Sequence, residues 1–103
     1  LLLFDIYIDK QQFEDLAQKA ESSMELLPLQ PQFYYFAGLA NNQLKNYKKA
    51  ANILEMGLDY LVEDTALEIN FYIQLGEAYN GLGNQSKKED YFVKAEKLLK
   101  LKK

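Results

Sequence analysis

Apolar residues recur at intervals of three and four positions along almost the whole of this chain. The segment "NYKKAANILEMGLDYL" shows the spacing most clearly, with apolar residues at Tyr47, Ala50, Ala51, Leu54, Leu58 and Leu61. This spacing places apolar side chains on one face of an α-helix. Similar stripes run through residues 13–24 and 91–99, and no useful length of sequence alternates polar and apolar residues as a half-buried strand does. The pattern predicts an all-α fold.

Proline and capping residues divide the pattern into helices. Pro28 disfavours helical geometry at the residue before it, whereas Pro31 suits the first position of the next helix. Thr65 and Glu68 are spaced as a capping box at a helix start, and Asn84 suits the cap of the last helix. The predicted helices span residues 1–8, 11–26, 31–44, 47–61, 65–81 and 85–100. Their short connections predict antiparallel neighbours.

The sequence also repeats itself with an offset of 38 residues. This offset aligns Gly38 with Gly76 and Leu54 with Phe92, and a further copy fills the start of the chain. Glycine inside a helix costs about 1 kcal/mol relative to alanine. We therefore predict that a partner helix approaches closely at Gly38 and Gly76; the alternative is that Gly76 is only a tolerated weak point.

The spacing resembles the tetratricopeptide repeat (TPR), a helix-turn-helix of about 34 residues with the signature W-x2-L-G-x2-Y, then A-x3-F, then P. Tyr72, Leu75, Gly76 and Tyr79 match its first half, with Tyr in place of Trp. The resemblance implies a right-handed α-solenoid of three stacked antiparallel helix pairs, forming a single domain over residues 1–103. The implied repeats are 1–30, 31–64 (extended to about 68) and 69–103. Because the second copy is longer, we expect the helix ending near Leu61 to run about one turn long.

In such repeats the first helices line a concave groove, and the family's groove positions can be located in this chain. They fall on Gln32, Tyr35, Leu39, Asn42 and Gln43 in the second copy, on Asn70, Ile73, Glu77, Asn80 and Gly81 in the third, and on Leu1, Asp5, Ile8 and Asp9 at the front. Asn and Gln can bond an extended peptide backbone, and the apolar members offer contacts to its side chains. The only charges in this set are acidic, so neutral or basic peptides are expected rather than acidic ones.

The composition excludes several kinds of chemistry. The chain contains no Cys and no His, which removes thiolate nucleophiles, Ser/His and Cys/His pairs and the common zinc sites. All twelve basic residues are Lys, and the net charge is −3, which disfavours nucleic acid as a partner. We expect no enzymatic activity, no cofactor and no metal. The absence of an apolar run near ~18 residues argues against membrane insertion, and the terminal "KLLKLKK" is interpreted as a solvated last turn.

The sequence thus favours a protein-interaction scaffold that binds an extended or helical peptide segment, without the carboxylate clamp known in the family. A structural spacer or oligomerisation module remains the alternative, and a helical-repeat RNA binder is disfavoured by the groove's charge. We interpret the chain as an internal fragment of a longer soluble bacterial protein, cytoplasmic or periplasmic. Self-association is expected through uncovered apolar solenoid ends, formed by "LLLF" at the start and by Tyr91 and Leu98 at the finish. Tyr35→Ala is expected to weaken partner binding with little loss of stability.

Overall fold

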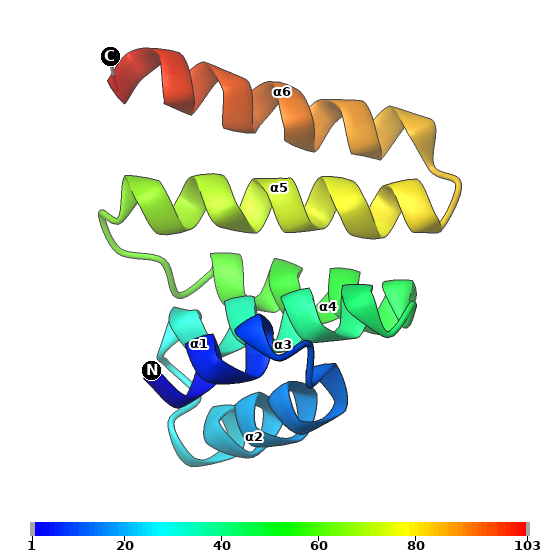
Figure 1. Cartoon of the computed structure of the whole chain (residues 1–103). Coiled ribbons are helices and arrows are strands. Elements are labelled where there is room, and N and C mark those ends of the chain that lie inside the picture. The colour runs from blue at the N-terminus through cyan, green and yellow to red at the C-terminus, as the bar shows by residue number, and fades with distance from the viewer. Residues whose placement is uncertain (1, 103) are drawn as a thin grey trace.

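A computed structural model describes residues 2–102, which form six α-helices and no strand (Figure 1). The helices are α1 (Leu2–Asp9), α2 (Phe13–Leu26), α3 (Pro31–Gln43), α4 (Tyr47–Leu58), α5 (Thr65–Gly81) and α6 (Gln85–Lys102). The all-α prediction is confirmed. Each predicted helix is present, with most ends within two residues of the expected position.

Local sequence signals set several of these boundaries as expected. Pro31 is the first residue of α3. Leu27, before Pro28, has left helical geometry, with φ −133° and ψ 70°. The side-chain oxygen of Asn84 accepts a hydrogen bond from the backbone N–H of Lys87 at 3.1 Å, so Asn84 caps the start of α6.

The cap of α5 differs from the prediction by one residue. Asp64, rather than Thr65, accepts a hydrogen bond from the backbone N–H of Leu67, at 3.0 Å. Thr65 is already the first helical residue, and Glu68 accepts instead from the Tyr72 hydroxyl at 2.7 Å. A carboxylate at the N-cap also complements the helix dipole, which favours Asp64 over the threonine that follows it.

The range of α5 is as predicted, but α4 does not run a turn long, which corrects the sequence prediction. α4 ends at Leu58 instead of near Leu61. α5 starts about a turn further ahead of Gly76 than α3 starts ahead of Gly38. The chain leaves α4 through a tight turn in which the Tyr60 N–H bonds to the Gly57 carbonyl at 3.0 Å.

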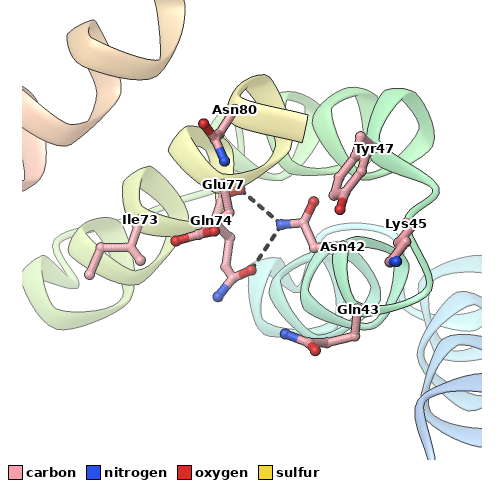
Figure 2. Close-up of a pocket in the computed structure, with 8 residues that line it drawn as sticks. All are labelled: Asn42, Gln43, Lys45, Tyr47, Ile73, Gln74, Glu77 and Asn80. Atoms are coloured by element: carbon pink, nitrogen blue, oxygen red, sulfur yellow. Dashed lines mark hydrogen bonds between the residues drawn. The ribbon is translucent and has the colours of Figure 1, made fainter. Parts of the chain in front are cut away.

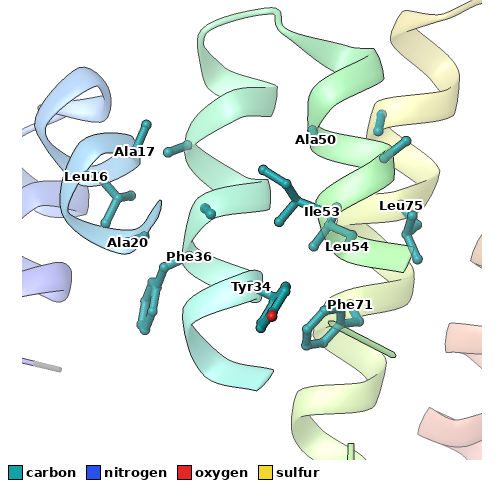
Figure 3. Close-up of a cluster of buried hydrophobic side chains, with 14 of the residues drawn as sticks. Leu16, Ala17, Ala20, Tyr34, Phe36, Ala50, Ile53, Leu54, Phe71 and Leu75 are labelled. Atoms are coloured by element: carbon teal, nitrogen blue, oxygen red, sulfur yellow. The ribbon is translucent and has the colours of Figure 1, made fainter. Parts of the chain in front are cut away.

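Helices that follow one another along the chain make the main contacts, and α3 also packs against α5. In Figure 1, α5 and α6 run antiparallel at one end of the molecule, and α6 packs mainly on α5. The core lies between α2, α3, α4 and α5 (Figure 3). Its largest fully buried apolar side chains are Leu16, Leu54, Phe71 and Leu75.

Gly38 and Gly76 are points of close helix contact, as predicted. A Cβ on Gly38 would overlap the side chain of Leu54 in α4, and one on Gly76 would overlap the Phe92 ring in α6. Both contacts therefore join residues that the 38-residue offset aligns. Gly57 makes a third close contact, against Phe71, which the repeat pattern did not predict.

The apolar ends of the chain differ in part from expectation. Leu2 and Leu3 are exposed on α1, but Phe4 is buried between the rings of Phe33 and Phe36. On α6, the half-buried Tyr91 packs against other tyrosines and Leu98 is also half-buried, so neither is the main exposed apolar residue there. The most exposed apolar side chains of α6 are Val93, Leu99 and Leu101.

Tyrosines join α5 to α6. The ring of Tyr91 stacks on Tyr72 and on Tyr79, each with centroids 5.9 Å apart. The hydroxyls of Tyr79 and Tyr91 both donate to Glu55 of α4, at 3.0 and 2.9 Å to the same oxygen. Burial, with help from these hydrogen bonds, raises the pKa of both tyrosines. Burial, followed by the hydrogen bond to Glu68, raises the pKa of Tyr72 to about 12.

These tyrosines predict an alkaline loss of stability. The folded protein holds the Tyr72 proton to a higher pH than the unfolded chain does, where the pKa is about 10. The contribution of Tyr72 to stability is therefore complete below about pH 10 and is lost as the pH rises to about 12. Urea denaturation across this interval should show a steeper decline for the parent protein than for Tyr72→Phe. Equal declines would contradict the assignment. Lysines also titrate in this pH interval, but they do so in both proteins, so the difference between the two declines reports Tyr72.

Candidate functional site

A pocket of about 400 Å³ opens between α3 and α5 beside the start of α4 (Figure 2). Its lining residues are Asn42, Gln43, Lys45, Tyr47, Ile73, Gln74, Glu77 and Asn80. The structure thus brings together five side chains of the sequence-predicted groove set, namely Asn42, Gln43, Ile73, Glu77 and Asn80. All five come from the second and third repeats.

The remaining members of the predicted set lie outside this pocket. Asp5 and Asp9 are exposed on α1, and Asn70 is exposed on α5. The other members within residues 2–102 are Ile8, Gln32, Tyr35, Leu39 and Gly81. Of these, Ile8, Tyr35 and Leu39 pack against the hydrophobic core. Leu1 lies outside the described residues.

Tyr35 is half-buried rather than free on the surface. Its ring centroid lies 5.3 Å from that of Phe36 and 6.2 Å from that of Phe71. Burial, followed by the nearby charge of Asp5, raises the pKa of Tyr35. Replacing Tyr35 by alanine would remove contacts to the core as well as to any ligand, so this variant does not separate binding from stability as the sequence alone suggested.

Asn42 connects α3 to α5. Its side chain is only 7% exposed. The amide Nδ2 donates to the backbone carbonyl and to the side-chain Oε1 of Gln74 in α5, both at 2.9 Å (Figure 2). The orientation of the amide is fixed because a backbone carbonyl can only accept a hydrogen bond. The opposite atom, Oδ1, is buried and has no hydrogen-bond partner within the described part of the chain.

The turn between α3 and α4 supplies one wall of the pocket. Lys45 adopts a left-handed backbone conformation with φ 65°, and the N–H of Asn46 returns to the Asn41 carbonyl at 2.8 Å. This tight turn sets Lys45 and Tyr47 beside the last turn of α3. The Tyr47 ring packs against Gly81, where a Cβ would overlap it. Gly81, predicted to end α5, therefore also makes room for a wall of the pocket.

Sequence reasoning missed Lys45, Tyr47 and Gln74. Tyr47 belongs to the apolar stripe of its helix, and Lys45 lies in a connection, so neither falls on a groove position of the repeat. The pocket consequently carries one basic residue, Lys45, and one acidic residue, Glu77. The expectation of a groove without lysine does not describe this pocket, whose formal charges balance.

Polar side chains at the rim are available to a ligand. Within residues 2–102, Gln43, Lys45, Tyr47, Glu77 and Asn80 form no side-chain hydrogen bond or ion pair with the protein. Ile73 adds an apolar surface. A few polar groups around apolar lining are typical of a binding pocket.

Metal binding and membrane insertion find no support in the described residues. They contain no group of three or more acidic, His or Cys side chains placed to hold a metal ion. None of the helices described is long and apolar enough to cross a membrane.

Comparison of the chain with protein-family models, with curated proteins and with solved structures found no match in any of the three. Function must therefore be argued from the geometry.

Proposed function

We propose that this chain is a segment of a TPR-like α-solenoid that binds a peptide of a partner protein across α3 and α5. The repeats are 1–30, 31–64 (extended to about 68) and 69–103, and in this arrangement α3 and α5 are the first helices of consecutive pairs. Two observations support the architecture. The Gly38–Leu54 and Gly76–Phe92 contacts share the 38-residue offset, and the main helix contacts are sequential apart from that between α3 and α5.

The observation that carries the function is the pocket between α3 and α5. The side chains of its polar rim make no hydrogen bonds within residues 2–102, and its lining combines an aliphatic side chain with amides that can donate and accept. No nucleophile with an adjacent base is among its residues, so the arrangement suits binding rather than chemical transformation. The balanced charges favour a neutral peptide over a strongly acidic or strongly basic one.

Selection from a library of random peptides displayed on phage tests this proposal. Synthetic copies of the selected peptides should bind the parent protein and should lose about tenfold or more in affinity to Gln43→Arg and Asn80→Arg. Both residues are exposed and unpaired, so the substitutions obstruct the rim without removing a contact of the fold. Loss of one well-placed contact and its hydrogen bonds accounts for an effect of this size.

Asn52→Arg is the matched control, because Asn52 is exposed on α4 and does not line the pocket. Peptides that bind the two rim variants as tightly as they bind the parent would contradict the proposed site. Failure to select any peptide would favour the spacer or oligomerisation module instead. The exposed Val93, Leu99 and Leu101 of α6 give that second candidate its structural basis.

A further inference from the structure

We propose that the α3–α5 pocket recognises a primary carboxamide, presented by a glutamine or asparagine side chain of the bound peptide. The inference rests on the proposed peptide-binding function and specifies its chemistry. Three features of the pocket support it: one orphaned acceptor, the groups beside it and the balance of charge.

Asn42 Oδ1 requires a donor. It is buried and unpartnered, and the two hydrogen bonds from Nδ2 to Gln74 prevent the amide from turning over to satisfy it. Leaving a buried acceptor unpaired is unfavourable, so a ligand that supplies an N–H gains more here than at an exposed acceptor. Figure 2 shows this oxygen on the side of the amide away from Gln74, toward Tyr47.

Access to Asn42 Oδ1 depends on the side chains at the rim. The oxygen is solvent-inaccessible, so an incoming donor must displace a neighbouring side chain. Gln43 and Asn80 are exposed and hold no side-chain hydrogen bond within residues 2–102, so their rotation breaks none.

The charges around the acceptor argue for a neutral donor group. Lys45 disfavours an ammonium or guanidinium group, and Glu77 together with the orphaned oxygen disfavours a carboxylate. A primary carboxamide offers two N–H donors on one side and a carbonyl acceptor on the other. Its N–H groups suit Asn42 Oδ1 and Glu77, while its oxygen suits the Tyr47 hydroxyl and the Lys45 ammonium.

The space fits a side chain of this size. The volume of about 400 Å³ lies within the range of small-ligand sites, ~300–1,000 Å³. Ile73 provides an apolar wall for the methylene groups that precede the carboxamide. A glutamine or asparagine side chain would thus present both its apolar and its polar parts to matching surfaces.

Titration with single-residue probes tests the assignment. The probes are the N-acetyl methylamides of glutamine, glutamate and lysine, which share one backbone. Glutamate differs from glutamine only in the end group, and lysine carries an ammonium group on a longer aliphatic chain. Observed by NMR, the glutamine compound should shift the side-chain amide signals of Asn42 and Gln74. It should bind about tenfold more tightly than the other two, as expected for two additional hydrogen bonds. Tyr47→Phe should reduce this preference about threefold or more, because it removes one donor and keeps the ring against Gly81.

Asn42→Leu should abolish the preference for the glutamine compound. If Asn42→Leu folds poorly, Tyr47→Phe still tests the assignment. Asn52→Ala, an exposed change on the same helix as Tyr47 and outside the pocket, should leave the titration unchanged. Equal or tighter binding of the lysine or glutamate compound would overturn the carboxamide assignment. NMR signal changes that are absent, or that map to residues outside the pocket, would overturn it as well. If phage-selected peptides still bind at the rim, the proposed function stands and this inference alone fails.

Discussion

Phe71→Ala is expected to lower the free energy of unfolding by about 3–5 kcal/mol, because it empties the centre of the core. The Phe71 side chain is fully buried in α5. It lies against Gly57 of α4 and near the ring of Tyr35 in α3, so one ring fills the space among three helices. Native domains have a total stability of about 5–15 kcal/mol. The loss is therefore a large fraction of the total, and the variant should unfold at a clearly lower urea concentration than the parent.

Urea denaturation followed by far-ultraviolet circular dichroism measures this effect. Phe71→Leu retains most of the buried apolar volume and should cost less than about 1.5 kcal/mol. Asn70→Ala, at the exposed neighbouring position, should stay within about 0.5 kcal/mol of the parent. A loss for Phe71→Ala no larger than that for Asn70→Ala would show that α3, α4 and α5 do not pack around this residue.

The helices could be predicted because their signals are local. The apolar period, the proline at the start of α3 and the cap at Asn84 each act within a few residues, and each has the predicted role. The close contacts of Gly38 and Gly76 could also be predicted, because the offset repeats them with the same partners. The end of α4 could not, because the apolar stripe continues to Leu61 whereas the chain leaves the helix after Leu58, where the Tyr60 N–H bonds to the Gly57 carbonyl.

The pocket could be predicted only in part, because it depends on how α3 lies against α5. The family pattern identified Asn42 and Glu77, but it treated Asn42 as exposed. Its burial follows from the hydrogen bonds to Gln74, a residue 32 positions away that no periodicity connects to it. The sequence places Gly81 at the groove and at the end of α5, but its contact with Tyr47 could not be predicted, since it joins α5 to the start of α4.

The two contact glycines predict different costs for the same substitution. Gly38→Leu should destabilise the protein more than Gly76→Leu, because Leu54 is fully buried in a helix held between α3 and α5. Phe92 is only half-buried, and α6 packs mainly on α5, so α6 can move outward to relieve the overlap. Overpacking lowers stability by about 1–3 kcal/mol where the surroundings can adjust and by more where they cannot. Replacing glycine by leucine inside a helix offsets about 1 kcal/mol of this loss through its higher helix propensity.

Thermal melting and amide hydrogen exchange distinguish the two outcomes. Gly38→Leu should lower Tm by at least about 10 °C, since 1 kcal/mol corresponds to about 4–8 °C in a domain of this size. Gly76→Leu should lower Tm by less and should speed amide exchange mainly in α6.

Combining Gly38→Ala with Leu54→Ala should cost less stability than the sum of the single changes, because the smaller side chain at position 54 makes room for the added Cβ. A Gly38→Leu variant that melts no lower than the parent, or additive costs in the double variant, would mean that α3 and α4 do not meet at this glycine. The close approach of the helices, on which the placement of α3 against α5 depends, would then need another explanation.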